Sequence, residues 1–463
     1  MSAIPDSVAT RASTAARARS DRLLRGPVLA TLLLLALPNL AVMLAQAAAN
    51  FLESYFVGLL GVDALAGAAL VFPLIMLMQT MSAGGMGGGI SSAIARAIGA
   101  GDTHKAQALA LHALVIALAF GVVCMLGGLL GGPLLYRAMG ATPAVQQAAA
   151  AYSNAIFAGA VFLWLANGMA SVLRGCGNMV LPAMVLSGGV LLLLVVSPLL
   201  IFGWGPVPAL GITGAGLALS VYYIVAAAVM LVAVLRGNGG VQLRLSHPLR
   251  WPLFRDILGV GAPAIVNNVT LNLSVLTATA LVSPLGSQAL AGFGLGIRLE
   301  YLQIPIVFGF GAAMVAMVGM NTGAGQLVRA RHVAWTGALL AAGVTSLVGL
   351  AAALFPAAWL GLFTQDQDAI RVGTQYLRTV GPAYGLFGLG LSLYFASQGA
   401  RRMGWSIVAG AARLLVVYLA GHLALRMGAG LPTLLAIMVA GLALYALLNA
   451  WPWFARPQDR PRP

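Results

Sequence analysis

Residues 51–61 read FLESYFVGLLG and end the first long apolar segment of the chain. From Pro27 to Phe51 no side chain carries a charge, and a run of this length is enough to cross a bilayer as a helix. A single carboxylate, Glu53, then interrupts the segment before the apolar residues resume. The stretch therefore predicts a membrane-spanning helix that carries an acid near one end.

Composition places the whole chain in the same class. Of the 463 residues, 60% are hydrophobic and 8% are charged, and the mean hydropathy is +0.95. A soluble domain is about 25% charged, so we expect an integral membrane protein. The two cysteines, Cys124 and Cys176, and the five histidines are scattered singly. Their spacing predicts neither a disulfide framework nor a metal site, and we expect no metal and no cofactor.

Apolar segments long enough to span a bilayer recur along the chain. They predict an all-α membrane protein with twelve transmembrane helices. The predicted spans are residues 28–58, 64–94, 107–131, 148–172, 180–204, 211–235, 256–283, 288–318, 333–355, 374–396, 404–425 and 431–454.

The distribution of basic residues predicts the topology, because lysine and arginine gather on the cytoplasmic side of a membrane. The odd-numbered loops hold only Arg137, Arg371, Arg378 and Arg426, whereas the tails and the even-numbered loops hold most of the others. Both termini are therefore predicted to be cytoplasmic, in the inner (plasma) membrane. The basic N-terminal residues lead into a full-length span, so we expect no cleaved signal peptide. The net charge of +15 reflects this topology, and nucleic acid is not an expected partner.

The two halves of the chain repeat each other. At an offset of 225 residues Pro38 falls on Pro263, Gly61 on Gly286 and ALAG at 64–67 on ALAG at 289–292; at an offset of 224 GAG at 99–101 falls on GAG at 323–325 and Tyr152 on Tyr376. A repeat of six spans leaves both halves facing the same way, so they are related by a pseudo-twofold axis along the membrane normal. We expect two six-helix lobes with a cleft between them, as in alternating-access carriers.

The repeat also predicts the domain boundaries. They are a cytosolic basic tail at residues 1–26, an N-terminal lobe at 27–235, a cytosolic linker at 236–255, a C-terminal lobe at 256–454 and a cytosolic tail at 455–463. We expect this chain to lie in the lipid bilayer as a monomer.

Several motifs resemble those of a known family. ESYFVGLLG at 53–61 followed by ALAG, IGAGD at 98–102, LRGCGN at 173–178 and NTGAG at 321–325 are similar to the multidrug and toxic compound extrusion (MATE) transporters. RLE at 298–300 resembles the DinF-like branch of this family, which belongs to the MOP flippase superfamily. The resemblance covers about residues 30–450 and implies a cation-coupled exporter of organic, often cationic or lipophilic, small molecules.

Glycines and prolines within the spans predict packing and bending. SAGGMGGGISS at 82–92 lacks the phosphate-loop pattern and lies in an apolar span, so it indicates close helix packing and a hinge. Pro38 removes a helix hydrogen bond fifteen residues before Glu53. We therefore expect the first span to bend at Pro38.

Elimination leaves Glu53 and Glu300 as the only carboxylates within spans. An ionisable group at the bilayer centre costs about 3 kcal/mol, so such a group usually faces a cavity. Burial favours the neutral carboxyl and would let Glu53 exchange a proton near neutral pH. Gln46, Asn50 and Glu53 follow at i, i+4 and i+7 and form one polar stripe. The alternative is an acid that lies among the outer headgroups.

The family resemblance gives Glu53 a role and also shows two departures. MATE transporters place an essential acid, usually Asp, five residues before the glycine of F-V-G, and Glu53 stands there relative to Gly58. DinF-like relatives carry Asn-x-x-x-Asp in the fifth span, where this chain has Leu193 and Ser197. The loss of these oxygen ligands disfavours sodium, so the predicted coupling ion is H⁺ through Glu53, with Na⁺ as the alternative. The acids of NorM-like relatives in spans seven and ten have no counterpart.

The other candidate site residues are less determined. Glu300 either pairs with Arg413 as a structural charge, or it lines the cavity of the second lobe and attracts a cationic substrate or carries a second proton. Arg298 is two residues away on a different helix face, and we expect it in the cavity. Asn167 in span four is a candidate hydrogen-bond neighbour of Glu53.

The predicted function is a cation-coupled antiporter that exports organic compounds by alternating access. Its alternative is a flippase for lipid-linked oligosaccharides or lipids from the same superfamily. Such flippases line their cavity with several basic residues, whereas only Arg298 and Arg413 lie in these spans. We do not expect an enzyme, because no Asp or Ser/His pair lies mid-span.

Overall fold

The computed structural model describes residues 17–237 and 239–454, and these residues are helical apart from turns, loops such as 239–250, and one isolated β-bridge between Trp204 and Val207. Ten helices are long and apolar enough to cross a membrane, or eleven if a bent pair is counted as one span. This confirms the predicted all-α membrane fold. The predicted tail at 455–463 and the first part of the tail at 1–26 lie outside the described residues.

The helices of the N-terminal half follow the predicted spans and extend a few residues beyond most of them. They are α2 (Val28–Gly58), α3 (Val62–Gln79), the π-helix η1 (Thr80–Met86), α4 (Gly87–Gly99), α5 (Thr103–Ala138), α6 (Pro143–Ala158), α7 (Ala160–Gly175), α8 (Val180–Phe202) and α9 (Ile212–Leu235). The long first helix α2 has the predicted bounds.

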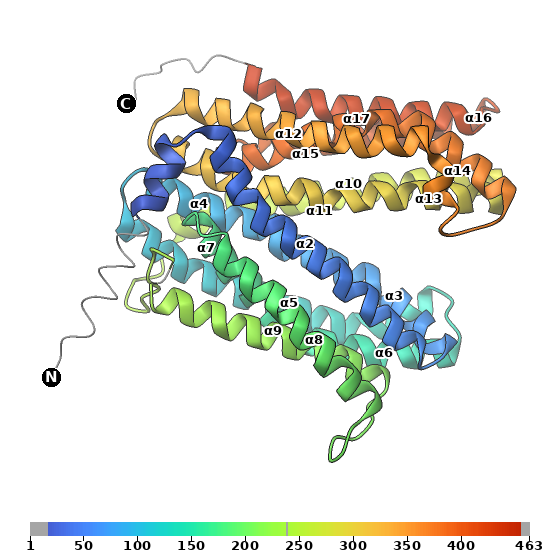
Figure 1. Ribbon diagram of the computed structural model, residues 1–463, viewed down its shortest axis with the longest axis horizontal. Helices are drawn as coiled ribbons and strands as arrows, with labels where there is room; N and C mark the ends of the chain where they lie inside the picture. Colours follow the sequence, from blue (N-terminus) through green and yellow to red (C-terminus); the bar gives the residue numbers. More distant parts are fainter. Residues whose placement is uncertain (1–16, 238, 455–463) are drawn as a thin grey trace.

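The C-terminal half repeats this order. Its elements are α10 (Trp251–Val282), η2 (Ser283–Leu285), α11 (Ser287–Gly323), α12 (Leu327–Leu354), α13 (Pro356–Leu360), α14 (Gln367–Val380), η3 (Gly381–Ala383), α15 (Tyr384–Gly399), α16 (Gly404–Arg426) and α17 (Leu431–Phe454). In Figure 1 both halves lie side by side, and the start of α2 and the end of α17 lie toward the same end of the molecule, which we call the inner end.

Two predicted spans are broken rather than continuous. The span predicted at 148–172 consists of α6 and α7, which meet at Gly159 with a bend of 46°. A Cβ atom at Gly159 would overlap the Ser220 side chain, so the bend brings α6 against α9. The span predicted at 374–396 is divided into α14 and α15 by η3, where Pro382 cannot donate a backbone hydrogen bond. The two breaks occupy equivalent places in the repeat.

The glycine-rich segment 82–92 contains a local change of helix type. Residues Thr80–Met86 form a π-helix between α3 and α4. The amide of Asn268 on α10 donates to the carbonyl oxygen of Thr80 at 3.3 Å, and the amide of Gln398 on α15 donates to that of Gly84 at 3.2 Å. Carbonyl groups of the π-helix thus accept hydrogen bonds from the opposite half.

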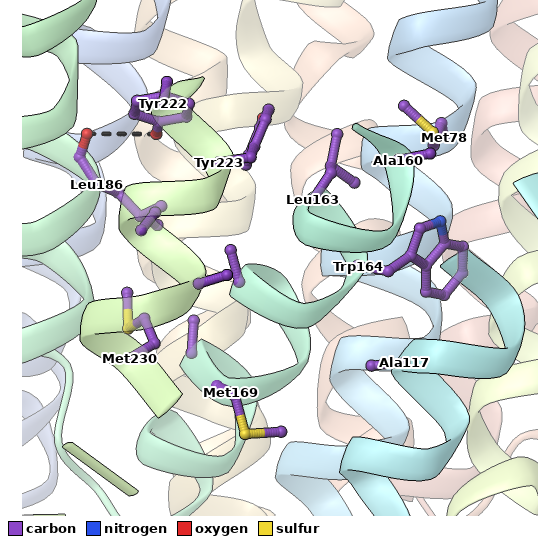
Figure 2. Packing of buried hydrophobic residues seen from close by; sticks show 14 of the residues in the cluster. Met78, Ala117, Ala160, Leu163, Trp164, Met169, Leu186, Tyr222, Tyr223 and Met230 are labelled. Carbon is purple, nitrogen blue, oxygen red and sulfur yellow. Dashed lines mark hydrogen bonds between the residues drawn. The ribbon is translucent and has the colours of Figure 1, made fainter. Parts of the chain in front are cut away.

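Each half encloses its own apolar core. Figure 2 shows part of the core of the N-terminal half, with Trp164 and Leu163 of α7 and Tyr222 and Tyr223 of α9. The Tyr222 hydroxyl donates to the carbonyl oxygen of Leu186 at 3.3 Å, which ties α9 to α8. A second cluster fills the C-terminal half, and a third joins the start of α2 to α11 and α12.

The halves meet through a reciprocal contact between α4 and α11. A Cβ atom at Gly99 would overlap the backbone of Met320, and one at Gly323 would overlap the backbone of Arg96. Residue 99 is equivalent to 323 and residue 96 to 320 at the offset of 224, so the two contacts are images of each other. This is the geometry that a pseudo-twofold axis between the halves requires.

The close contact predicts that two Gly→Ala substitutions will change the stability of the fold by different amounts. Gly99→Ala should lower the thermal unfolding temperature, because overpacking against a backbone costs about 1–3 kcal/mol. Gly127→Ala in α5 is the matched control, since a Cβ atom there has no neighbour within 4 Å. Unfolding of the purified protein in detergent measures both. Equal unfolding temperatures for Gly99→Ala and the parent would contradict the contact.

Candidate functional site

Glu53 lies on α2 beyond Pro38 and is partly buried against α6. The hydroxyl of Tyr152 donates to Glu53 Oε1 at 2.5 Å. Tyr152 is on α6, about two turns before the bend at Gly159. The hydroxyl that binds the Glu53 carboxylate therefore comes from the part of the fourth span that precedes the bend.

A small cavity lies beside Glu53, between α2 and α8. Its lining consists of Ala49, Leu52, Glu53, Phe56, Val190, Leu193, Leu194 and Ser197. Leu193 and Ser197 are the positions at which the resemblance predicted a lost amide and a lost acid, and both lie on this cavity with Glu53. The Ser197 hydroxyl is buried and has no hydrogen-bond partner among the described residues.

The oxygen atoms around this cavity favour a proton over a metal ion. Among its lining side chains only Glu53 and Ser197 carry oxygen. A hard cation prefers several oxygen ligands, including carboxylates and carbonyl groups. One carboxylate and one hydroxyl do not form such a set, whereas a lone carboxylate suffices to take up and release a proton. In the described part of the chain no group of three or more His, Cys, Asp or Glu residues is placed to bind a metal.

The rest of the predicted polar stripe lies along the same helix. Gln46 is partly buried and its side chain lies close to the Tyr222 hydroxyl. Asn50 is partly buried, and its backbone oxygen accepts a bond from the Ser54 hydroxyl at 2.9 Å. The stripe therefore faces α9 and the interior of the N-terminal half near the cavity.

Asn167 is not the neighbour of Glu53 that we expected. It is buried on α7, and its amide donates to the Ser82 hydroxyl of the π-helix at 2.8 Å. The partner of Glu53 in the fourth span is Tyr152, and Asn167 follows it by fifteen residues, about 22 Å farther along the span. The match of Tyr152 with Tyr376 in the repeat was the available signal for its importance.

Glu300 on α11 is held by two partners. Arg413 Nη2 on α16 lies 3.0 Å from Glu300 Oε1, and both side chains are about 95% buried. The hydroxyl of Tyr376 on α14 donates to Glu300 Oε2 at 3.1 Å. Of the two roles left open for Glu300, the geometry favours the structural charge.

Each of the two membrane acids accepts a hydrogen bond from a tyrosine, and the two tyrosines are equivalent in the repeat. The acids themselves lie on helices that are not equivalent. Tyr152 and Tyr376 are equivalent, whereas Glu53 lies on the first span and Glu300 on the eighth. Only Glu300 has a cationic partner among the described residues. The carboxylate in the N-terminal half has a tyrosine hydroxyl as its hydrogen-bond partner instead.

Arg298 and Pro38 complete the predicted site residues. Arg298 is exposed, and its guanidinium lies over the ring of Phe363 at 5.4 Å, away from Glu300. Pro38 lies inside α2, which runs unbroken from Val28 to Gly58. The Asn39 amide donates to the Leu35 carbonyl oxygen at 3.1 Å. A hinge at Pro38 stays a prediction.

A family model supplies the identification. The model of the MatE family matches residues 38–199 and 263–422, and the two matches begin 225 residues apart, as Pro38 and Pro263 do. The chain belongs to the MatE family. Members of this family are integral membrane transporters of small molecules and not enzymes.

Relatives within this family agree over most of their length. The chain is 26% identical to an FAD transporter of Shewanella oneidensis, covering 86% of this chain and 88% of that protein. It is 26% identical to a probable multidrug resistance protein NorM of Thermotoga maritima, covering 80% and 79%. A solved MOP superfamily transporter from Pyrococcus furiosus, described as having a binding pocket of reverse polarity, is 25% identical with a TM-score of 0.86, covering 94% and 96%.

The buried pair of this MatE protein predicts non-additive effects on stability. Arg413→Met alone leaves Glu300 buried without its cation and should cost about 3–5 kcal/mol. The double variant Glu300→Gln, Arg413→Met removes both charges and should recover much of that loss. Thermal unfolding in detergent of both single variants and the double variant measures the coupling. Additive changes would show that Glu300 and Arg413 are not energetically coupled.

Proposed function

We propose that this MatE protein exports organic, often cationic or lipophilic, compounds in exchange for protons, with Glu53 as the coupling acid. The observation that carries the proposal is the contrast between the two membrane acids. Glu300 is neutralised by Arg413, whereas Glu53 lies on a cavity wall and is bonded by a neutral tyrosine hydroxyl. Glu53 is therefore able to bind either a proton or a cationic ligand.

Competition between proton and ligand for one carboxylate gives a mechanism of exchange. An ionised Glu53 attracts a lipophilic cation that enters from the cytosol or the inner leaflet. When a proton from outside neutralises Glu53, the ligand loses its counter-charge and leaves. A change of the proton affinity by three pKa units between states corresponds to about 4 kcal/mol, or a thousandfold in ligand affinity. In this proposal both termini are cytoplasmic, and the helix α2 adjusts at Pro38.

The sparse oxygen ligands support H⁺ as the coupling ion. Leu193 stands where an amide would complete a sodium site, and Ser197 offers only a hydroxyl. The relatives named as multidrug resistance proteins support organic substrates, and the Shewanella relative adds flavin nucleotides as a class to be tested.

The contacts of the two arginines in the spans disfavour the flippase alternative. Arg413 is engaged by Glu300, and Arg298 lies over Phe363. Neither is placed as a free cation beside the cavity that contains Glu53.

Glu53→Gln should abolish proton-driven efflux without loss of folding, because glutamine keeps the shape of the side chain and cannot exchange a proton. The assay uses proteoliposomes loaded with ethidium under an imposed proton gradient or sodium gradient, with FAD as a second cargo. Glu53→Asp is the matched control and should retain transport at a reduced rate. Unfolding temperatures of both variants check the fold.

Two results of this assay would overturn the assignment. Full proton-driven transport by Glu53→Gln would place the coupling group elsewhere. Transport driven by sodium alone would show that other oxygen ligands form an ion site.

A further inference from the structure

A cluster of four charges lies at the inner end, far from Glu53. Asp256 is in the second turn of α10 and is 6% exposed. Its Oδ1 lies 2.7 Å from Arg96 Nη2 and 3.2 Å from Arg401 Nη1, and its Oδ2 lies 3.3 Å from Lys105 Nζ. One buried carboxylate therefore serves three cations.

The partners of Asp256 come from both halves of the molecule. Arg96 is on α4 and Lys105 is on α5, in the N-terminal half, whereas Arg401 follows α15 in the C-terminal half. The side chain of Arg96 is 14% exposed, so its ion pair with Asp256 is shielded from solvent. A shielded pair is little screened by salt, and removal of one partner leaves an uncompensated charge.

Hydrogen bonds reinforce the same junction. The Ser92 hydroxyl on α4 donates to the carbonyl oxygen of Gln398 at 2.5 Å and lies 3.2 Å from that of Gly399. The Arg96 guanidinium donates to the Ser92 hydroxyl and, at 3.4 Å, to the carbonyl oxygen of Gly399. Arg96 thus binds both the carboxylate at the start of α10 and the end of α15.

The backbone of Arg401 is a second, independent observation. Its φ of 57° is the only positive φ of a non-glycine residue in the described part of the chain. The equivalent residue at the offset of 224 is Gly177, with φ 76°, as expected for a residue that ends a helix in the left-handed region. An arginine there carries a steric cost that glycine does not. The pair with Asp256 is the contact that this side chain gains.

We propose that Asp256, paired with Arg96 and Lys105, forms a latch that holds the two halves together at the inner end, and that Arg401 positions the Asp256 carboxylate from within the C-terminal half. The halves already touch there through Gly99 and Gly323, where only backbone and small side chains fit. Separation of the halves at this end requires that Arg96 and Lys105 leave Asp256. The latch therefore sets the population of molecules that are open on this side. The inference rests on the proposed function in assuming that transport involves such an opening.

A buried cysteine at the junction reports the opening directly. Met320 on α11 is fully buried where α11 meets Gly99, so a cysteine there reacts with a polar maleimide only while the halves are apart. The reporter is Met320→Cys, in protein whose Cys124 and Cys176 are replaced by alanine. The reaction rate is proportional to the open population even when that population is small. This readout needs no substrate, no ion gradient and no transport.

Asp256→Asn should raise the labelling rate at this reporter about tenfold, a typical size for coupling between conformational states. Lys105→Gln should raise it as well, since it removes one of the two cations that reach Asp256 from the N-terminal half. Lys105→Arg, which keeps the charge, and Arg402→Gly, which removes a charge that makes no ion pair among the described residues, are the matched controls and should stay near the parent rate.

A second reporter separates opening of the junction from general loosening. Met230 is fully buried inside the N-terminal half, and Met230→Cys should label at the same slow rate in all variants. Unchanged rates at Met320→Cys in both Asp256→Asn and Lys105→Gln would overturn the latch. Equal increases at both reporters would also overturn it. Because Lys105→Gln leaves the Asp256 carboxylate with Arg96 and Arg401, it tests the latch even if Asp256→Asn does not fold.

Failure of the latch and failure of the proposed function give different results. If Glu53 is not the coupling acid, Glu53→Gln keeps proton-driven efflux while the labelling rates still follow the latch variants as expected. If the latch is wrong, the labelling pattern fails while proton-driven efflux still depends on Glu53.

Discussion

The close approach of α4 and α11 is the constraint on which the arrangement of the two halves depends. It requires glycine at residues 99 and 323, because any Cβ atom there would overlap the backbone of the opposite helix. In a bilayer, burial of apolar side chains between helices gives little free energy, because the lipid tails are equally apolar. Close packing at small residues therefore contributes much of the association between the two halves. The pseudo-twofold axis that relates the halves repeats this contact, so Gly99 and Gly323 each meet the backbone of the opposite half.

The two halves have the same backbone arrangement, but they differ in the charged groups that they carry. Tyr152 and Tyr376 occupy equivalent positions and each donates to a membrane acid, yet one acid has a guanidinium beside it and the other has none. The same division appears at the inner end, where Gly177 in one half corresponds to Arg401 in the other. In the duplicated scaffold, one half therefore holds a carboxylate paired with a cation, and the other holds a carboxylate bonded to a neutral hydroxyl.

Sequence patterns predicted the elements that depend on local composition. Hydropathy, charge and the repeat were sufficient for the all-helical fold, the two related halves and the two acids at 53 and 300, because each signal is carried by a few adjacent residues or a constant offset. Tyr152 as the partner of Glu53 was missed, since the contact depends on a bend at Gly159 that is visible only in the packing against Ser220. The charges around Asp256 were assigned to span ends and loops. Their association joins segments 96, 105, 256 and 401, and no local pattern indicates it.

The π-helix at Thr80–Met86 sets the rotational phase of α4. A π turn holds more residues than an α turn, so it displaces every following side chain around the helix axis relative to α3. Each residue of an α-helix corresponds to about 100° of rotation, and conversion of this segment to α geometry would turn α4 by a step of that size. Ser92, Arg96 and Gly99 all lie on α4 and would leave their partners together. The phase of one helix thus governs the polar, ionic and close-packed contacts between the halves at once.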